Sequence, residues 1–296
     1  MPGLIYSELS EHIQHYVFII NPVSGTRDKR QVEQLIRNQF NDRSYELLFT
    51  QSPGHAMVLA SQFKSNKNTC VIAVGGDGTI NEIAQSIVSH PVKLGIIPRG
   101  SGNGFAGHAL GNKSIKDYLQ TIKNPRIASC DVILINGQIC CNTAGFGLSG
   151  YVAKLFNEKG ERGLFNYVRL GLREFKNITK FNVLVDDLML TDLINIEVAN
   201  SSQLGNKAFV SPNSSIQDGL AELVMLKKPQ FSKVPGIILD LFTKNLQHHS
   251  AVQIISRSSA RIVCKEPYHY HIDGEYRGTT DHIDFKVINN ALNLII

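Results

Sequence analysis

The sequence predicts an N-terminal α/β domain built on a parallel sheet, followed by a C-terminal all-β sandwich domain. Strand-like and helix-like segments alternate through the first half, as in proteins with a parallel sheet. From about Cys130 onward, short alternating segments separated by turns dominate instead. The 296 residues suffice for two domains of about 100–200 residues each. We expect one domain at 1–129 and a second at 130–296. Whether the last residues return to the first domain is left open at this point.

Apolar runs in the first half predict strands, and amphipathic segments between them predict helices. The predicted strands are Tyr16–Ile20, Tyr45–Thr50, Thr69–Val74 and Lys93–Ile97, and the predicted helices are Lys29–Phe40, His55–Phe63 and Thr79–Val88. Because each strand is followed by a helix, the strands should run parallel, with helices covering both faces of the sheet.

The second half is predicted to form a β-sandwich or barrel interrupted by helices near Gly163–Lys176 and Pro235–Asn245. Asn136-Gly137 predicts a hairpin turn between two strands. The predicted strands are Asp131–Asn136, Asn182–Val185, Leu193–Ala199, Ala221–Leu226, Val252–Ser256, Ala260–Val263, Tyr268–Ile272 and His282–Val287.

Composition and charge narrow the function classes. The net charge is +5, which is compatible with polyanionic substrates or an anionic membrane surface. No run of five basic residues occurs, so nucleic acid is not an expected partner. The five cysteines are odd in number and form no C-x-x-C pair, which favours a reducing, cytoplasmic compartment. Apolar stretches fall short of the ~20 residues that span a bilayer, so we expect any membrane contact to be peripheral.

The strongest motif is the string Gly75-Gly76-Asp77-Gly78-Thr79, followed by Asn81 and Glu82. A buried strand ends at glycines where a helix begins, and amides at a helix N-terminus can face phosphate oxygens. The carboxylate of Asp77 could hold Mg²⁺ or activate a hydroxyl. The alternative is an ordinary turn with Asp77 as the helix cap, which the full string disfavours.

Two further polar loops follow strands of the same predicted sheet. They are Asn21-Pro22-x-Ser24-Gly25 and Pro98-Arg99-Gly100-Ser101-Gly102-Asn103-Gly104. The carboxyl ends of parallel strands gather at one edge, where such sheets bind ligands. Three loops at this edge therefore predict a nucleotide-phosphate site. A weak dinucleotide fingerprint at Gly102 lacks the expected context, and no P-loop string is present.

The combination of NP-x-SG, GGDGT-x-NE, PRGSGN and a late HIDGE string resembles the diacylglycerol kinase catalytic-domain family. That family includes sphingosine and ceramide kinases and small bacterial lipid kinases. The likeness runs from Asn21 to about Gly278 in the expected order. NAD kinases and phosphofructokinases share only the GGDG element. The resemblance implies an N-terminal domain like theirs, a C-terminal β-sandwich, and ATP with Mg²⁺ in the cleft between them.

The resemblance also assigns roles to individual residues. Residues implied in nucleotide binding are Asn21, Ser24, Gly25, Thr50, Gly75, Gly76, Asp77, Gly78, Thr79, Glu82, Ser101 and Asn103. Residues implied in metal binding are Asp131, near the catalytic Mg²⁺, and Ser215, Asp218 and Leu220, at a structural metal of the second domain. Glu275 is implied as the proton acceptor, and Asp77 is the second candidate for that role.

Several features leave alternatives open. Gly104 stands where many bacterial diacylglycerol kinases have Asp, and the GSGN loop is closer to that of sphingosine and ceramide kinases. Asp273 and Glu275 either face one side of a strand or flank a hairpin turn with exposed acids. The helix near Gly163–Lys176 either packs on the β domain or borders an acyl-chain pocket. His269-x-His271 lacks further ligands at zinc-finger spacing.

The predicted function is an ATP- and Mg²⁺-dependent kinase that phosphorylates the hydroxyl of a membrane lipid such as diacylglycerol. A sphingosine- or ceramide-type lipid kinase, a kinase with a soluble acceptor as in NAD kinases, and a nucleotide- or lipid-binding regulator without turnover are the alternatives. The partners we expect are the lipid substrate and the membrane surface, and a homodimer would be compatible with the family resemblance.

Overall fold

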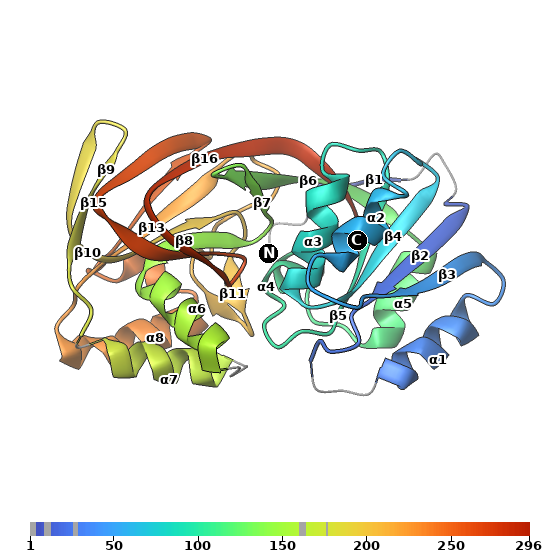
Figure 1. The fold of residues 1–296 in the computed structure, drawn as a ribbon, viewed down its shortest axis with the longest axis horizontal. Helices are drawn as coiled ribbons and strands as arrows, with labels where there is room; N and C mark the ends of the chain where they lie inside the picture. Colours follow the sequence, from blue (N-terminus) through green and yellow to red (C-terminus); the bar gives the residue numbers. More distant parts are fainter. Residues whose placement is uncertain (1–3, 9–12, 26–28, 160–163, 176) are drawn as a thin grey trace.

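The computed structural model describes residues 4–8, 13–25, 29–159, 164–175 and 177–296 (Figure 1). As predicted, an N-terminal α/β domain precedes a β-rich domain. The strands of the first domain are β1 (Ser7–Glu8), β2 (His15–Ile20), β3 (Ser44–Phe49), β4 (Thr69–Gly75) and β5 (Lys93–Pro98). Its helices are α1 (Lys29–Gln39), α2 (His55–Ser61), α3 (Asp77–Ile87), α4 (Gly104–Leu110) and α5 (Ile115–Lys123).

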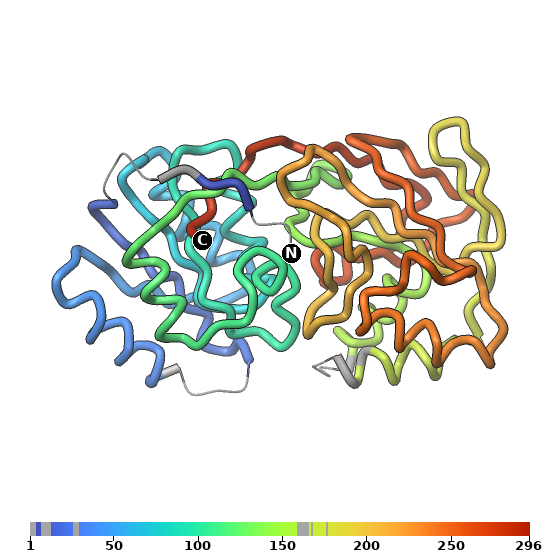
Figure 2. Tube along the Cα trace, turned by 180° about the vertical axis from the view of Figure 1, so that it is seen from behind, coloured from blue at the N-terminus to red at the C-terminus, as the bar shows by residue number. Residues whose placement is uncertain are grey.

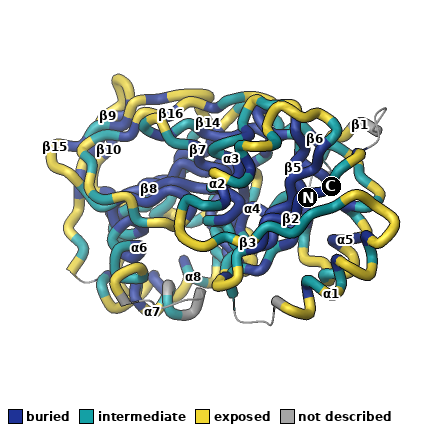
Figure 3. Tube along the Cα trace, turned by 45° about the vertical axis from the view of Figure 1, so that its right-hand side comes forward, coloured by how far each residue is buried: buried dark blue, intermediate teal, exposed yellow. Residues whose placement is uncertain are grey.

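Strands β2 to β5 pair in parallel, with β2 between β3 and β4, and β4 beside β5. Every residue of β4 is buried, which explains why its sequence is a continuous apolar run rather than an alternating one. Figure 3 shows that buried residues gather in the central strands, while α1 and α7 expose their outer faces. The carboxyl ends of β2, β4 and β5 therefore meet at one edge.

Helices α4 and α5 were not predicted. Helix α5 begins at a capping box in which Ser114 and Asp117 hydrogen bond reciprocally, so its start was readable in the sequence. Helix α4 has no side-chain cap, because Asn103 before it adopts a left-handed conformation. Seven residues that include two glycines give too weak a helical signal to be recognised without the packing around them.

The second domain consists mainly of antiparallel strands. Its strands are β6 (Arg126–Ile135), β7 (Gln138–Cys140), β8 (Thr143–Gly147), β9 (Phe181–Val185), β10 (Leu188–Ala199), β11 (Gln203–Gly205), β12 (Ala208–Phe209), β13 (Ala221–Lys227), β14 (Val252–Arg257), β15 (Ser259–Ile272) and β16 (Glu275–Ile295). Its helices are α6 (Leu148–Lys159), α7 (Leu164–Glu174) and α8 (Val234–Thr243), with short 3-10 turns at Phe231–Lys233 and Leu246–His248.

The strands of this domain enclose a second core, separate from that of the α/β domain. Its large members come from several strands and include Phe146, Ile196, Ile262 and Phe285. The predicted hairpin at Asn136-Gly137 is confirmed, since both residues have positive φ and β6 pairs with β7 across them. The domain boundary expected after residue 129 falls inside β6.

Several details of the second half differ from the prediction, and strands β8, β11 and β12 had no predicted counterpart. Ala260–Val263 and Tyr268–Ile272 belong to one strand, β15, rather than two. Helix α6 was missed, because Gly150 near its start disfavours a helix in sequence terms. A Cβ at Gly150 would collide with the backbone of His269 and Tyr270, so glycine is required there for α6 to approach β15. Helix α7 was predicted, although Gly163 and Lys176 at its expected ends lie outside the described residues.

Strand β16 joins the two domains. It pairs with β15 and β6 in the second domain, and its end runs parallel to β5, with Leu294 beside Leu94. Figure 2 shows the end of the chain lying within the first domain. Leu292, Leu294 and Ile295 are buried in the core of that domain. A single run of paired strands thus extends from β14 to β3.

Within the described ranges, no helix combines the length and apolarity needed to cross a membrane. All five cysteines are buried and free of disulfides.

Candidate active site

The second and third glycine loops touch each other at the edge of the parallel sheet. The amide of Arg99 donates to the carbonyl of Gly75 at 2.6 Å. A Cβ added to Gly76 would lie 2.9 Å from the Cα of Gly100, which is closer than real Cβ atoms come. Both glycines are therefore needed for the close approach of the two loops. Helix α3 begins directly after Gly76, so its first amides face the space beside these loops.

The first loop joins them through Asn21. Its side-chain amide donates to the hydroxyl of Thr79 at 3.2 Å, and its backbone amide donates to Val74 at 3.0 Å. The hydroxyl of Ser24 donates to the carbonyl of Asn21 at 3.0 Å, and Gly25 has a φ of 63°. The three loops predicted to surround one ligand thus do converge.

Two of the residues predicted to bind nucleotide, Glu82 and Asn103, instead use their side chains in hydrogen bonds within the protein. Glu82 accepts hydrogen bonds from the amides of Gly54 at 2.8 Å and Ala56 at 3.0 Å, one to each carboxylate oxygen. Its carboxylate therefore fixes the start of α2. Asn103 bonds to both the amide and the carbonyl of Gly100, at 2.9 and 2.8 Å. That pair of contacts holds the third loop in a closed turn.

Thr50 and Ser101 lie at the margins of this group. Thr50 follows β3, and its amide donates to Ile20 at 3.0 Å, which places it beside the first loop. Ser101 is exposed, and its carbonyl accepts a hydrogen bond from the side chain of Asn206 at 2.6 Å.

Asp77 carries the one carboxylate of the glycine string. Its Oδ2 accepts from the amide of Gly104 at 3.2 Å. Its Oδ1 is buried and has no hydrogen-bond partner among the described residues. Burial, and then the negative charge of Asp273, raise the pKa of the Asp77 carboxyl to about 6. An unpaired buried oxygen beside a second acid is an environment that a cation would stabilise.

Asp273 belongs to a turn, not to an extended strand. Asp273 and Gly274 have φ of 50° and 81° and connect β15 to β16, with Ile272 opposite Glu275. The extended alternative is therefore wrong. The expectation that a turn would expose its acids is also wrong for Asp273, which is buried.

The reason for this burial is the number of donors around the Asp273 carboxylate. It accepts hydrogen bonds from the side chain of Asn81 at 2.7 Å and from the amides of Cys141, Asn142 and Thr143 at 3.0, 2.8 and 3.2 Å. Asn81 belongs to the Asn-Glu pair that follows the glycine string in the sequence motif. The three amides could not be identified from the sequence, because backbone donors leave no residue-type signal.

Glu275 lies against the first turn of α3. A Cβ on Gly78 would come within 2.5 Å of its Oε1, so the carboxylate occupies the space that any larger residue at Gly78 would fill. The guanidinium of Arg277 is 3.6 Å from the other oxygen. The side chain is about half exposed. Gly78, which follows Asp77, and Glu275 thus lie in contact although almost 200 residues separate them in the chain, whereas Asp218, expected to join Asp77 and Glu275, lies in another loop.

The residues predicted to bind metal form a separate group. Asp131 is buried, and its two oxygens accept from the amides of Gly219 and Asn290, both at 2.8 Å. These bonds direct its carboxylate toward the Asp218 loop, not toward Asp77. Asp218 is exposed and accepts from the amide of Leu220 at 3.0 Å. Partial desolvation of its carboxyl, and then the nearby Asp131 charge, raise the pKa of Asp218.

Ser215 accepts from the amide of Gln217 at 3.2 Å in the same loop. In the described part of the chain, no group of three or more His, Cys, Asp or Glu side chains is arranged to hold a metal ion. A metal at either place would need ligands from backbone, water or substrate as well.

A cleft opens between the domains beside these loops. It is lined by Asp77, Ser101, Gly102, Asn142, Thr143, Phe156, Leu204, Gly205, Asn206, His271, Asp273 and Gly274. The hairpin β11–β12 supplies one wall and was not predicted, although its turn at Asn206 and Lys207 has the positive φ that Gly-Asn sequences favour. Leu204 of this hairpin also lines a second cavity.

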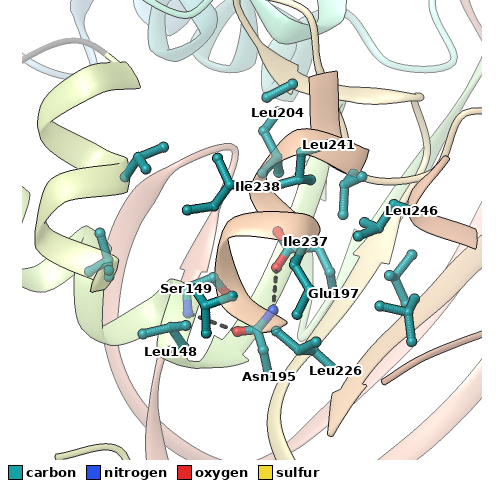
Figure 4. A pocket seen from close by; sticks show the side chains of 18 of the residues that line it. Leu148, Ser149, Asn195, Glu197, Leu204, Leu226, Ile237, Ile238, Leu241 and Leu246 are labelled. Atoms are coloured by element: carbon teal, nitrogen blue, oxygen red, sulfur yellow. Dashed lines mark hydrogen bonds between the residues drawn. The ribbon is translucent and has the colours of Figure 1, made fainter. Parts of the chain in front are cut away.

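The second cavity is an apolar pocket of about 180 Å³ between α6, α7, α8 and the sheet (Figure 4). It exceeds the ~150 Å³ of an apolar cavity able to hold benzene. Val168 and Leu172 of α7 line it together with Phe175 just after the helix, so α7 borders an apolar pocket, and its use by an acyl chain stays a prediction. Among the described residues of the lining, the polar side chains are those of Ser149, Asn195 and Glu197.

Comparison with known proteins agrees with this geometry. Residues 15–135 match the family described as the diacylglycerol kinase catalytic domain, and residues 142–296 match the YegS C-terminal NAD kinase beta sandwich-like domain. The chain is 27% identical to a diacylglycerol kinase of Bacillus subtilis (strain 168) over 88% of this chain and 89% of that protein. It is 27% identical to a probable lipid kinase YegS-like of Yersinia pestis (strain Pestoides F) over 77% and 79%.

A solved structure has the same fold. The crystal structure of a diacylglycerol kinase from Bacillus anthracis str. Sterne superposes with a TM-score of 0.72 at 20% identity and covers 95% of this chain and 96% of that one. The fold and the convergent loops define a two-domain enzyme of the lipid kinase class. The chain belongs to the diacylglycerol kinase catalytic-domain family.

Proposed function

We propose that this protein transfers the γ-phosphoryl group of ATP to the hydroxyl of a membrane lipid in a Mg²⁺-dependent reaction. The observation that carries the proposal is the position of Glu275 against Gly78, the residue that follows Asp77 at the start of α3. Phosphoryl transfer requires phosphate binding, charge neutralisation and a base near the acceptor hydroxyl. Those three needs match the glycine loops, Asp77 and Glu275, respectively.

The glycine loops would hold the triphosphate. At Gly76 the two loop backbones approach each other with no side chain between them, and helix α3 begins directly after Gly76, which suits close contact of its first amides with phosphate oxygens. Mg²⁺ would neutralise the charge that develops on the transferred group. The partnerless Oδ1 of Asp77 is the oxygen available to hold it.

Glu275 is the better placed base. Both oxygens of Asp273 accept several hydrogen bonds, and Asp77 is engaged by Gly104. Glu275 is instead half exposed and 3.6 Å from Arg277, so it can take the proton of an acceptor hydroxyl.

The apolar pocket supports a lipid acceptor over a soluble one. Its lining is apolar apart from three side chains, and a hydrocarbon chain would bury surface there at about 25 cal/mol per Å². Exposed apolar residues of the neighbouring segment, Phe231, Leu239 and Phe242, lie next to Lys233 and Lys244. That mixture suits peripheral contact with an anionic membrane.

The test is an assay with γ-labelled ATP, Mg²⁺ and lipid in mixed micelles. The wild type should label a lipid and no soluble acceptor. Asp77→Ala and Glu275→Ala should each reduce transfer at least ~10²-fold, since each removes a charge or base used at the transferred group. Asp186→Ala, in a turn of the second domain, serves as the control. Full activity of Asp77→Ala would rule out the phosphate site as described.

A second acceptor class has its own support. A Cβ at Gly104 would lie 2.7 and 2.8 Å from the carbonyls of Gln203 and Leu204 and would also meet Asn142. An aspartate at this position has no room, so the loop keeps the glycine form that resembles sphingosine and ceramide kinases. A labelled lipid extract resolved by headgroup distinguishes these acceptors from diacylglycerol.

A further inference from the structure

Asn142 is a buried polar residue in the wall of the cleft between the domains. It lies between β7 and β8, is 4% exposed, and lines the cleft together with Asp77. A buried carboxamide is costly unless its donors and acceptors have partners. The partners of each polar group of Asn142 therefore show whether the residue has a structural role alone.

Three of the four polar groups of Asn142 are paired within the protein. Its backbone amide donates to Oδ1 of Asp273 at 2.8 Å. Its backbone carbonyl accepts from the amides of Asn200 and Ser201 at 2.9 and 3.3 Å. Its side-chain oxygen accepts from the hydroxyl of Ser201. These contacts hold the backbone in place and fix the orientation of the carboxamide.

The fourth group, the side-chain nitrogen Nδ2, lies beside Gly104. A Cβ at Gly104 would collide with Nδ2, so the missing side chain leaves the room in which this nitrogen lies. No described residue accepts a hydrogen bond from Nδ2. It is not one of the partnerless atoms that are shut off from solvent, so a ligand in the cleft can reach it.

Gly104 also contacts the acid of the glycine string. Its amide donates to Oδ2 of Asp77 at 3.2 Å, and Oδ1 of Asp77 has no partner among the described residues. An unpaired donor and an unpaired acceptor therefore lie next to the same residue. A cation stabilises the carboxylate oxygen, whereas the amide of Asn142 needs an oxygen that accepts. A phosphoryl group with a bound divalent cation offers both.

The rest of the cleft lining gives an anion little support. No lysine or arginine is among the described residues that line it. The carboxylate of Asp273 is occupied by its donors, including Asn81 and the amide of Asn142. Negative charge is spread over the equatorial oxygens of a phosphoryl group during transfer, and fixed N–H donors stabilise such charge. Asn142 is a buried donor of this kind, and the second domain supplies it.

We propose that Nδ2 of Asn142 donates a hydrogen bond to a non-bridging oxygen of the transferred phosphoryl group, so that Asn142 is a further catalytic residue. The inference rests on the proposed lipid kinase function and deepens it. In the reaction, the bond between the γ-phosphorus and the bridging oxygen of ADP breaks and a bond from phosphorus to the acceptor oxygen forms. The hydroxyl proton passes to Glu275. Asn142 stays neutral and exchanges no proton.

Two substitutions separate this role from a structural one. Asn142→Asp keeps the shape and an oxygen for Ser201 but replaces the donor by an anionic oxygen, whereas Asn142→Ala removes the carboxamide. Each should lower kcat about 10²-fold, as loss of an oxyanion-hole donor does, with a much smaller change in the KM for lipid. If Asn142 served only to hold Ser201, Asn142→Asp would stay active and Ser201→Ala would lose as much activity as Asn142→Ala.

Binding of a phosphoryl mimic gives a readout that does not depend on turnover. Titration calorimetry measures the Kd of ADP in the presence of Mg²⁺, with and without beryllium fluoride, which takes the place of the γ-phosphoryl group. The wild type should bind ADP more tightly with the fluoride. Asn142→Ala should weaken binding of ADP with beryllium fluoride about tenfold. Its Kd for ADP alone should not change, which also shows that the glycine loops remain folded.

Asn182→Asp is the matched control. Asn182 is an exposed residue of β9, its side-chain oxygen accepts from the amide of Asp192 at 3.1 Å, and it lines neither cavity. The substitution makes the same exchange of amide for carboxylate and keeps that oxygen. It should leave kcat and both Kd values at the wild-type level.

The outcomes for the inference and for the proposed function differ. A wild type that phosphorylates lipid while Asn142→Asp keeps the wild-type kcat would overturn the inference and leave the proposed function standing. A wild type without transfer that binds ADP more tightly with beryllium fluoride, and loses this in Asn142→Ala, would refute the lipid kinase proposal alone. A wild type that shows neither transfer nor the fluoride effect would refute both.

Discussion

At the scale of single residues, the chemistry depends on carboxylates held in unlike surroundings. Asp273 is surrounded by donors, whereas Asp77 has one unpaired buried oxygen and the Asp273 charge beside it. A site organised in this way is less stable without its ligand than with it. The same arrangement that suits a cation should therefore reduce the stability of the free protein.

The reduced stability of the ligand-free protein leads to a prediction for how Asp77→Asn depends on pH. The pKa of Asp77 is about 6 in the folded chain, against 3.8 as its ordinary value. Between these values the unfolded chain releases a proton that the folded chain keeps, so wild-type stability falls as pH rises through this window. Asp77→Asn has no carboxyl group at this position, so its stability does not fall for this reason over the same pH range. Thermal unfolding without nucleotide or metal should show Asp77→Asn gaining on the wild type between pH 4 and 7.

Asp42→Asn is the control with opposite sign. A hydrogen bond from Lys123 lowers the pKa of this exposed carboxyl, so its contribution is present above pH 4 and is lost on acidification. The variant should be slightly less stable than the wild type at pH 7. A Tm difference for Asp77→Asn that does not change with pH would contradict the described environment of Asp77.

Residue types were readable from the sequence where a motif fixed them. The glycine string, Asn21 and Glu275 were identified, and the structure brings them together. Asn142 was missed because a single amide between two strands carries no pattern. Its partner Ser201 is 59 positions away in the chain.

At the scale of elements, α4 shows how a loop and a helix are fixed by another domain. Its first residue, Gly104, lies under the carbonyls of β11, and Asn206 of the same hairpin bonds to Ser101 and Gly102. The third glycine loop therefore has its shape because β11–β12 packs on it.

We predict that Gly104→Asp destabilises the protein instead of adding a metal ligand. The new side chain would displace Asn142 or push β11 away, which costs about 1–3 kcal/mol as overpacking, with a further cost for a buried charge. Thermal unfolding should show a Tm several degrees lower, and added Mg²⁺ should not restore it.

Ser101→Asp introduces the same charge three positions earlier on an exposed residue. It should leave Tm within about 1–2 °C of the wild type, as surface substitutions usually do. If Gly104→Asp were as stable as Ser101→Asp, the packing of β11 against α4 would not be as described.

At the scale of the whole molecule, β16 makes the two domains depend on each other. It starts at the proposed base Glu275 and ends at Ile295, and Leu294 near its end pairs with β5 on one side and β6 on the other. The position of Glu275 beside α3 is thus set by a strand anchored in both cores.

Leu294→Ala tests this dependence. The side chain is fully buried in the first core, so its truncation should cost about 2–5 kcal/mol in the free energy of unfolding. Leu294 belongs to the core of the domain that carries the glycine loops. The variant should therefore also weaken nucleotide binding at temperatures where this domain begins to unfold. Urea denaturation and ATP binding measure the two effects.

Leu188→Ala, at an exposed position of β10, is the comparison. It should change the free energy of unfolding by no more than about 0.5 kcal/mol. A loss for Leu294→Ala no larger than this would mean that the end of β16 is not part of the first core.

The sequence by itself determined the order of the domains, most strands, and which glycine-rich loops meet at one edge of the parallel sheet. These follow from local patterns, since apolar runs and glycine strings act within a few positions. Tertiary structure alone decided that Asp273 is buried, that Gly104 has no room for a side chain, and that the side-chain amide of Asn142 lies beside Gly104. Such contacts depend on strand register and domain packing, which join residues whose separation in the chain leaves no local signal.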